Sequence, residues 1–216
     1  MVNLSEYEKN ILAGNTGIPG DRMAMELVVE SAKILGATSL IPIVSSHVDG
    51  CLYHGDSGVL YCEKLAENGT QVKIPTTTNV GALNLSKLSQ TKLSKEKRDM
   101  AYRLMKVHQE MGCVPTWTCA PYQAGARPSF GQQVAWGESN AVAFTNSILG
   151  ARTNRYGDFL DIACAISARA PYYGLHRSEN RTAKLMLDVS NLSNKLLQED
   201  AFFPVLGSMV GKLTGE

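Results

Sequence analysis

The sequence lacks an excess of charge of either sign. Its 216 residues include 21 Lys and Arg against 20 Asp and Glu, so the formal net charge is +1. A chain this close to neutral has no long-range attraction for nucleic acid or for an anionic membrane. It also lacks any apolar run that approaches the roughly 20 residues of a membrane span, and its first residues lack the apolar stretch of a signal peptide. We therefore expect a cytoplasmic protein with neither nucleic acid nor membrane as a partner.

The cysteines lack a C-x-x-C pair, and their number is odd. They are Cys51, Cys62, Cys113, Cys119 and Cys164. A disulfide framework is not expected in a reducing compartment, so most of these residues should be buried thiols, with one or more free to bind metal. The four histidines lack the spacing of a zinc site. Residues 207–213 resemble a phosphate-binding loop but are one residue short of it.

What the sequence does contain is typical of a folded α/β protein. Hydrophobic residues make up 44% and charged residues 19% of the chain, which is enough for a real core. Strand, loop and helix patterns alternate at least three times, which favours a mainly parallel sheet with flanking helices. The patterns predict helices at 5–14, 23–35, 57–67, 94–111, 138–149, 158–167 and 203–213, and strands at 39–44, 71–77, 114–118 and 184–189. No clear linker divides the chain.

Three polar loops follow the first three predicted strands. They cover residues 45–50, 76–81 and 119–133. Ligands of parallel sheets bind beyond the carboxyl ends of the strands, so we expect these loops to meet at one edge. In the first loop Ser45 and His47 are candidate ligand-binding residues, although a turn with a hydrogen-bonded histidine is equally compatible. Thr77 and Asn79 in the second could bind a polar ligand or cap a turn.

A second group of candidates starts at a predicted helix. Glu138, Ser139 and Asn140 lie where free backbone N–H groups can hold an anion. Arg152 and Arg155 follow, and a guanidinium group suits a carboxylate or phosphate. Ordinary helix capping and surface ion pairs are the alternative.

Cys119 lies just past a predicted strand on a proline-containing polar loop. A cysteine in this position can be a metal ligand or a nucleophile. A buried structural thiol is the alternative, because free cysteine usually behaves as a small hydrophobic residue.

Two long runs resemble the catalytic region of the aconitase X family. One is Gly112-Cys-Val-Pro-Thr-Trp-Thr-Cys-Ala-Pro-Tyr-Gln123, and the other extends from Ala135-Trp-Gly-Glu-Ser-Asn140 to Arg152-Thr-Asn-Arg-Tyr-Gly-Asp-Phe159. Shorter matching segments are 12–14, 47–50, 75–79 and 174–180. The resemblance covers nearly the whole chain in the family's order.

The resemblance implies an aconitase-like three-layer architecture and a hydro-lyase that removes water from a β-hydroxy acid with an iron or iron–sulfur centre. The sequence of residues 79–81 and 115–123 is more similar to the branch of the family that converts cis-3-hydroxy-L-proline to pyrroline-2-carboxylate than to its other branch. The branch that dehydrates mevalonate 5-phosphate is the alternative. Cys119 matches a family iron ligand. The implied substrate-binding residues are Ser45, His47, Thr77, Asn79, Glu138, Ser139, Asn140, Arg152 and Arg155.

The family's large subunit runs well past residue 216, and its other cluster cysteines lie in that later part. Its catalytic base is a serine on a swivelling domain, which is either a separate small subunit or fused to the large one. We therefore expect residues 1–216 to be an N-terminal portion that alone is inactive and binds no stable cluster. The remaining hypotheses are a non-catalytic interaction module and an unrelated α/β enzyme with Cys119 as nucleophile, which would need a histidine within reach.

Overall fold

The computed structural model describes residues 2–214. They divide into two compact units, the first ending at Arg181 and the second starting at Thr182. The helices of the first unit are α1 (Glu6–Leu12), α2 (Pro19–Ile34), α3 (Asp56–Glu67), α4 (Lys95–Glu110), α5 (Ser139–Phe144) and α6 (Leu160–Ser167). Its strands are β1 (Leu40–Pro42), β2 (Ser46–Val48), β3 (Thr76–Thr78), β4 (Ala135–Trp136) and β5 (Arg169–Pro171). A π-helical turn, Thr145–Leu149, extends α5.

The central sheet is parallel, with the strand order β3-β2-β4. His47 of β2 lies between Thr77 of β3 and Trp136 of β4. Isolated parallel bridges extend the sheet on both edges, with Val114 beside Thr77 and Arg155 beside Trp136. The α/β expectation with a parallel sheet is thus confirmed, although its regular strands are only two or three residues long.

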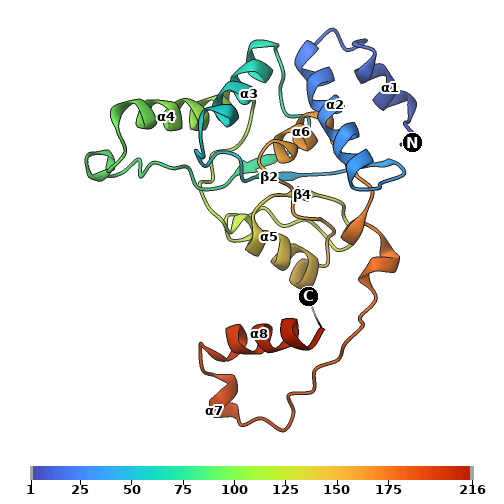
Figure 1. Ribbon diagram of the computed structural model, residues 1–216, viewed down its shortest axis with the longest axis vertical. Helices are drawn as coiled ribbons and strands as arrows, with labels where there is room; N and C mark the ends of the chain where they lie inside the picture. Colours follow the sequence, from blue (N-terminus) through green and yellow to red (C-terminus); the bar gives the residue numbers. More distant parts are fainter. Residues whose placement is uncertain (1, 215–216) are drawn as a thin grey trace. The chain divides into compact units, whose positions relative to one another are not determined.

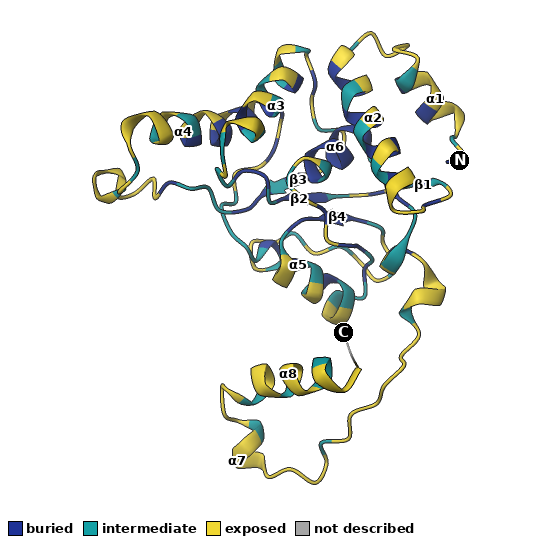
Figure 2. Cartoon of the chain, in the orientation of Figure 1, coloured by how far each residue is buried: buried dark blue, intermediate teal, exposed yellow. Residues whose placement is uncertain are grey.

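Helices cover both faces of this sheet. Figure 1 shows α2, α3 and α6 on one side of the strands and α5 on the other. Ser46 faces α6, because its hydroxyl donates to the carbonyl of Asp161 over 3.4 Å and to the carbonyl of Ala135 over 2.8 Å. Trp136 faces the other way and packs against Val134 and Ala141 of the α5 side. The strands between the two helix layers are buried (Figure 2).

Several predictions about the strands were wrong. At 114–118 only Val114 forms an isolated bridge, and no strand is present. Residues 45–50 were predicted as a loop, but β2 within them is the central strand, because β3 and β4 pair with it on both sides. The predicted strand at 39–44 is β1, and it does not join the parallel sheet. It pairs antiparallel with β5, so that Ile41 lies opposite Ala170. Three-residue strands depend on such distant partners, which a local pattern does not reveal.

The helix predictions of the first unit were largely confirmed. Helix α1 begins with a capping box, in which the Ser5 N–H donates to Glu8 Oε2 over 2.6 Å. Helix α2 begins at Pro19, earlier than predicted, because proline is well suited to the first turn. Ser94 caps α4 by accepting the Lys97 N–H over 3.3 Å. The alternation of hydrophobic and polar residues was therefore a sufficient guide to these helices.

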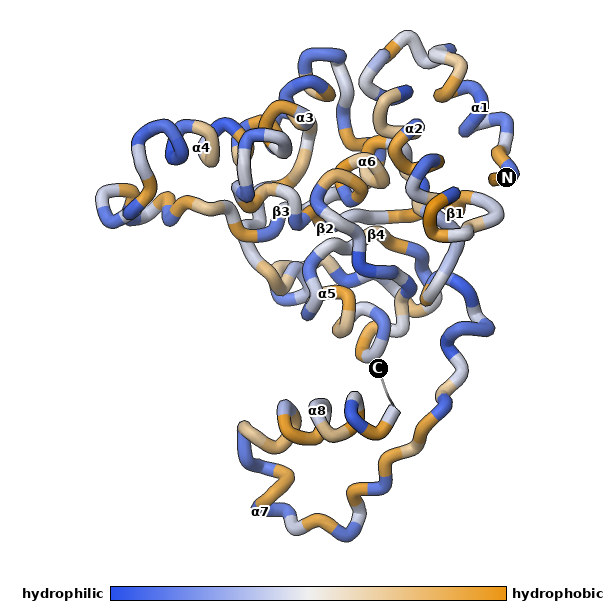
Figure 3. Tube along the Cα trace, in the orientation of Figure 1, coloured by the Kyte–Doolittle hydropathy of each residue, from blue (hydrophilic) through white to orange (hydrophobic). Residues whose placement is uncertain are grey.

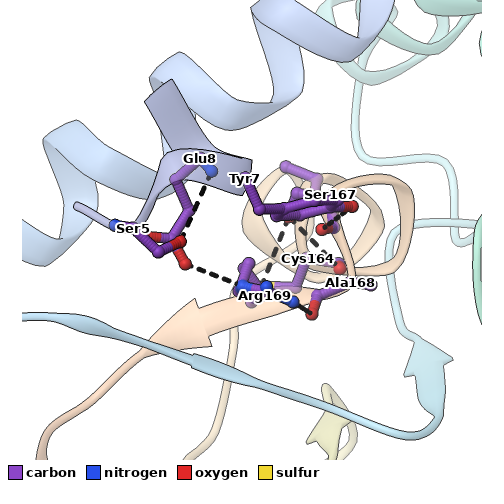
Figure 4. Close-up of polar contacts among 8 residues, drawn as sticks. Ser5, Tyr7, Glu8, Cys164, Ser167, Ala168 and Arg169 are labelled. Carbon is purple, nitrogen blue, oxygen red and sulfur yellow. Dashed lines mark hydrogen bonds and ion pairs between the residues drawn. The ribbon is translucent and has the colours of Figure 1, made fainter. Parts of the chain in front are cut away.

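A buried ion pair attaches α1 to the end of α6 and the start of β5 (Figure 4). Arg169 Nε lies 2.7 Å from Glu8 Oε1, and the two side chains are 15% and 4% exposed. The guanidinium carbon also lies 4.2 Å from the centre of the Tyr7 ring, and the Tyr7 hydroxyl donates to the Ser167 carbonyl over 3.1 Å. The amino-terminal helix is thus attached by polar contacts as well as by apolar packing.

The second unit contains α7 (Asn194–Leu197) and α8 (Phe202–Thr214). Helix α8 confirms the predicted helix at 203–213, and Figure 3 shows it coloured mostly from hydrophobic to neutral. The predicted strand at 184–189 was wrong, because the structure assigns these residues no strand. Among residues 2–214, no helix is long and apolar enough to cross a membrane.

Acid is expected to destabilise the first unit, because two buried histidines resist protonation. Burial lowers the pKa of His47 to about 4, although the Glu138 carboxylate opposes this shift. Burial also lowers the pKa of His176 to about 4, and Arg152 and Arg181 act in the same direction. In the unfolded chain both imidazoles bind a proton near pH 6.5. Their contribution to stability is therefore complete above pH 6.5 and is lost as the pH falls towards 4.

Urea denaturation should give a free energy of unfolding that is lower at pH 5 than at pH 7 by about 2 kcal/mol for each of these histidines. His176→Gln should remove its share of the pH dependence. His54→Gln is the control, because His54 is exposed and should leave the pH dependence intact. The pKa values of Asp49 and Asp161 are raised and act in the opposite direction, so the comparison between variants decides: the same pH dependence in His176→Gln as in the wild type would contradict this prediction.

Candidate functional site

Three polar residues lie just beyond the carboxyl ends of neighbouring strands. Asp49 follows β2, Asn79 follows β3, and Glu138 comes two residues after β4. The Asn79 side-chain amide donates a hydrogen bond to Asp49 Oδ1 and another, 2.9 Å long, to Glu138 Oε2. One amide group therefore connects two carboxyl groups, and we call these three residues the carboxamide cluster.

The start of α5 fixes Glu138 and the loop that carries Cys119. The Ser139 hydroxyl donates to Glu138 Oε1 over 3.0 Å, and the Asn140 side-chain amide donates to the Cys119 carbonyl over 2.9 Å. Partial burial raises the pKa of Glu138, but hydrogen bonds from Ser139, Asn79 and the N–H groups at the start of α5 outweigh burial and lower it. Glu138 is therefore a carboxylate at neutral pH.

Asp49 has the opposite electrostatic environment. Burial raises the pKa of Asp49, and the charges of Glu138 and Asp158 add to the rise, while the Asn79 amide and Arg155 oppose it. Arg155 Nη2 lies 3.7 Å from Asp49 Oδ2. The cluster thus pairs an ionised Glu138 with an Asp49 that keeps its proton to a higher pH than an ordinary aspartate does. Opposite shifts of this kind in one site are typical of acid–base chemistry.

The loop after β2 and the ends of two other elements meet at very close range. A Cβ atom at Gly50 would clash with the Asp158 carbonyl oxygen. A Cβ atom at Gly137 would lie 2.9 Å from Asp49 Cβ and 3.1 Å from Asp161 Oδ2. Only glycine fits at either position without moving the backbone, so the close approach of these segments depends on both glycines.

Cys119 is partly exposed, whereas the other four cysteines are buried. Burial raises the pKa of its thiol, and the negative charges of Glu138 and Asp49 add to the rise, while the Val80 N–H and the Asn79 amide oppose it. Two residues earlier, Trp117 has a left-handed backbone with φ of 46°, which is uncommon for a bulky residue and stores strain next to the site. Cys119 therefore lies beside the carboxamide cluster as a neutral thiol.

The structure argues against Cys119 as the nucleophile of an unrelated enzyme. A nucleophilic cysteine needs a base or a lowered pKa. Among the residues that the structure describes, no hydrogen bond joins Cys119 to a histidine. His47, the histidine singled out in the sequence, has its Nδ1 atom 2.8 Å from the Thr77 hydroxyl, and the Nδ1 atom of His108, the nearest histidine in the sequence, lies 2.8 Å from the Leu104 carbonyl.

The metal-binding side chains at this edge of the sheet could supply one ligand of an iron site but not a complete set of ligands. Within residues 2–214 there is no group of three His, Cys, Asp or Glu side chains that could hold a metal ion. The accessible thiol of Cys119, beside polar groups at the edge of the sheet, suits a single iron ligand. Further ligands would have to come from outside the described residues.

Other predicted site residues lie elsewhere. Ser45 and Thr77 line a cavity of about 280 Å³ together with Arg127 and Trp136. This cavity includes residues that precede β2 and β3, so it begins at the amino ends of these strands. His47 is fully buried, and its Nε2 atom has no hydrogen-bond partner within the described part of the chain. Ser45 and Thr77 are therefore not part of the carboxamide cluster, whereas His47 lies close enough to it for the Glu138 charge to oppose the fall of its pKa.

Arg152 and Arg155 also lie at different places in the structure. Arg155 lies beside Trp136 near the carboxyl end of β4, whereas Arg152 lies beside Gln133 before the strand begins. The Arg152 guanidinium donates to the His176 carbonyl over 3.1 Å and to the Ser178 hydroxyl over 2.8 Å. It holds the segment after β5 in place, and Arg155 alone of the two lies at the cluster.

Two residues of the site were not singled out from the sequence. They are Asp49 and Asp161. The Asp161 carboxyl is fully buried and accepts the Asp49 N–H over 2.6 Å and the Gly50 N–H over 3.1 Å. Burial raises the pKa of Asp161, and these N–H groups oppose the rise. The signal in the sequence that could have found Asp161 was an acidic residue at the start of a predicted helix.

The reactivity of Cys119 should respond to Glu138. Removing that negative charge in Glu138→Gln should lower the pKa of the thiol, so alkylation by iodoacetamide at pH 7.5 should become faster. Glu179→Gln is the control, because Glu179 is exposed and pairs with Arg177. Peptide mass spectrometry would follow Cys119 separately from the buried cysteines. An unchanged rate in Glu138→Gln would show that the carboxylate does not act on the thiol.

The fold and the cluster define the chain as an α/β domain with a thiol and two carboxyl groups at the edge of a parallel sheet. The chain belongs to the aconitase X family: the family model described as "Aconitase X first domain" matches residues 1–179. This confirms the resemblance found in the sequence.

Curated relatives are dehydratases of two kinds. Cis-3-hydroxy-L-proline dehydratase from Pseudomonas aeruginosa is 39% identical over 97% of this chain and 36% of the enzyme. The phosphomevalonate dehydratase large subunit from Thermococcus kodakarensis is 38% identical over 98% of this chain and 52% of that subunit. A crystal structure of Thermococcus kodakaraensis aconitase X in its holo-form has a TM-score of 0.74 and 40% identity, covering 84% of this chain and 45% of that one. The chain thus spans between about a third and half of the length of these relatives.

Proposed function

We propose that the chain is the first domain of a larger hydro-lyase that converts cis-3-hydroxy-L-proline to pyrroline-2-carboxylate. The carboxamide cluster beside Cys119 carries the proposal, because it combines an ionised carboxylate, a second carboxyl group whose pKa is raised and a partly exposed thiol. The similarity to a cis-3-hydroxy-L-proline dehydratase over 97% of the chain supports the choice of reaction.

In this proposal Cys119 holds iron or an iron–sulfur cluster, with the remaining ligands outside the chain. The metal, when bound, supplies a Lewis acid for the departing hydroxyl group of the substrate. A single thiolate does not retain a cluster, since protein clusters use three or four ligands. We therefore expect residues 1–216 alone to bind no stable cluster and to be inactive.

The chain's own residues would bind the substrate and handle one proton. Arg155 suits the substrate carboxylate, because its guanidinium is exposed and only weakly engaged by Asp49 at 3.7 Å. Asn79 orients both carboxyl groups, and Ser139 and Asn140 hold Glu138 and the Cys119 loop. Asp49 is placed to give its proton to the leaving hydroxyl.

The base that removes the α-proton belongs, in this proposal, to a partner. The partner is a small subunit or a fused swivelling domain. Relatives named as large subunits, and a relative of which this chain covers only 36%, support such a partner.

Mevalonate 5-phosphate is the second candidate substrate. The similarity to phosphomevalonate dehydratase large subunits favours it nearly as well, at 38% identity. That substrate carries a phosphate in addition to its carboxylate, and binding both calls for more positive charge than one guanidinium provides. Within the described residues Arg155 is the guanidinium at the cluster and suits one carboxylate, and the 39% identity to a cis-3-hydroxy-L-proline dehydratase supports hydroxyproline as the first candidate.

The test is an anaerobic assay of the full-length, iron-loaded protein with its partner. We expect kcat/KM for cis-3-hydroxy-L-proline to exceed that for mevalonate 5-phosphate by at least about 100-fold, since a site built for one substrate leaves polar groups of the other unpaired. Mass spectrometry would identify pyrroline-2-carboxylate. The reverse preference would assign the second substrate, and turnover of neither would favour a non-catalytic interaction module.

A further inference from the structure

Asp161 is a fully buried carboxyl group near the start of α6 that does not itself belong to the carboxamide cluster. Both of its oxygens accept backbone N–H groups. Oδ2 accepts those of Asp49 and Gly50 over 2.6 and 3.1 Å, and Oδ1 accepts that of Ile162 over 2.6 Å. Its partners at Oδ2 are 112 and 111 residues away in the sequence, so these bonds join two distant segments.

The N–H groups of Asp49 and Gly50 lie just past the end of the β ladder. Strand β2 ends at Val48, and its neighbour β4 ends at Trp136. The N–H group after β4, on Gly137, donates back to the His47 carbonyl over 2.9 Å. Among residues 2–214, no strand continues beside Asp49 and Gly50 to accept their N–H groups. The Asp161 carboxyl accepts the hydrogen bonds that a neighbouring strand would otherwise accept.

We propose that Asp161 is a positioning residue that fixes the loop after β2, so that the Asp49 side chain meets Asn79 and Glu138. It acts through Asp49 and touches no substrate. The close packing of Gly137 against both Asp49 and Asp161 Oδ2 leaves the loop little alternative space once these bonds form. The kinetic part of this inference rests on the proposed function, and the structural part does not.

Asparagine is the informative replacement, because it keeps the shape of the Asp161 side chain and removes one acceptor. Both oxygens of Asp161 face N–H donors. Whichever way the new amide is oriented, Asp161→Asn therefore places an NH₂ group against at least one N–H donor. The loop or the start of α6 then loses a hydrogen bond, while the side-chain volume stays nearly the same.

The structural test uses hydrogen exchange of backbone amides in the 216-residue chain, measured by NMR. In Asp161→Asn the Asp49 and Gly50 amides should exchange at least about 10-fold faster than in the wild type, as expected when a protecting hydrogen bond is weakened. The control is Asp188→Asn in the second unit, where Asp188 accepts the Ser190 N–H over 2.9 Å. Unchanged exchange at Asp49 and Gly50 would overturn the proposal.

The kinetic test is a double-mutant cycle in the full-length, iron-loaded enzyme. Asp161→Asn should lower kcat about 100-fold, as expected when a reacting group is misplaced, with KM and iron content nearly unchanged. In the Asp49→Asn background it should have almost no further effect, because Asp161 acts through Asp49. Equal losses of kcat in both backgrounds would overturn the positioning role.

A second variant covers the case in which Asp161→Asn does not fold. Gly137→Ala pushes on the same loop from the side of β4, since its Cβ atom would lie 2.9 Å from Asp49 Cβ. Gly137→Ala should make the Asp49 and Gly50 amides exchange faster and should lower kcat. In the Asp49→Asn background it should cause no further loss of kcat, as for Asp161→Asn. If it changes neither, the proposal fails. A wild type with no dehydratase activity would refute the proposed function, and the exchange measurement would still decide whether Asp161 fixes the loop.

Discussion

Cys119→Ser is expected to lower kcat/KM of the full-length dehydratase at least about a thousandfold, which corresponds to ~4 kcal/mol of transition-state stabilisation. In the proposed mechanism Cys119 is the one metal ligand on this domain, and serine is a poor substitute for a thiolate towards iron. Iron analysis of the purified variant should show a matching loss of bound metal. Substrate turnover and iron content should therefore fall together.

Cys62→Ala is the matched control for this substitution. Cys62 is buried, and its sulfur lies 3.8 Å from His108 Nε2. Its removal should leave the iron content and kcat/KM close to those of the wild type, with a modest loss of stability. A Cys119→Ser enzyme that keeps its iron and its activity would show that this cysteine is not a ligand.

Arg169→Met is expected to lower the free energy of unfolding of the first unit by about 3–5 kcal/mol. The substitution leaves the Glu8 carboxylate buried without its charged partner, at a position where the side chain is only 4% exposed. It also removes the guanidinium from the face of the Tyr7 ring. Urea denaturation at pH 7 would measure the loss.

Lys9→Met is the control for the buried ion pair. Lys9 pairs with Glu6 over 2.8 Å on the surface of the same helix, and both side chains are more than half exposed. Exposed pairs contribute little, so this variant should unfold close to the wild type. Similar stabilities of Arg169→Met and Lys9→Met would mean that the ion pair shown in Figure 4 does not anchor α1.

The helices could be predicted from the sequence because their signals are local. Ser5 and Glu8, which form the capping box, are close neighbours in the sequence. The apolar residues that mark α2 also recur within a few residues of one another. The strands could not be predicted in the same way. Strand β2 has three residues, and its position in the middle of the sheet depends on pairing with Thr76–Thr78 and Ala135–Trp136.

The site was predicted in part for a related reason. The rule that ligands bind beyond the carboxyl ends of parallel strands predicted that the loops of Asn79 and Cys119 meet, and the structure brings these two residues together. Glu138, which joins them, was predicted separately as an anion-binding residue at the start of a helix. The same rule misplaced Ser45, because the strand begins after this residue instead of ending before it. Asp161 was not found because its hydrogen bonds to Asp49 and Gly50 join segments far apart in the sequence, as the separations of 112 and 111 residues show.

The central claim is that Asp49, held by Asn79 and Asp161, serves the dehydration of the substrate. Its most direct test is kcat/KM for cis-3-hydroxy-L-proline in the full-length, iron-loaded Asp49→Asn enzyme, with Asp99→Asn, at an exposed position of α4, as the control. We predict a loss of about 10²–10⁴-fold in Asp49→Asn, the usual effect of removing a general acid, with iron content unchanged. An Asp49→Asn enzyme that works as fast as the wild type would contradict the account.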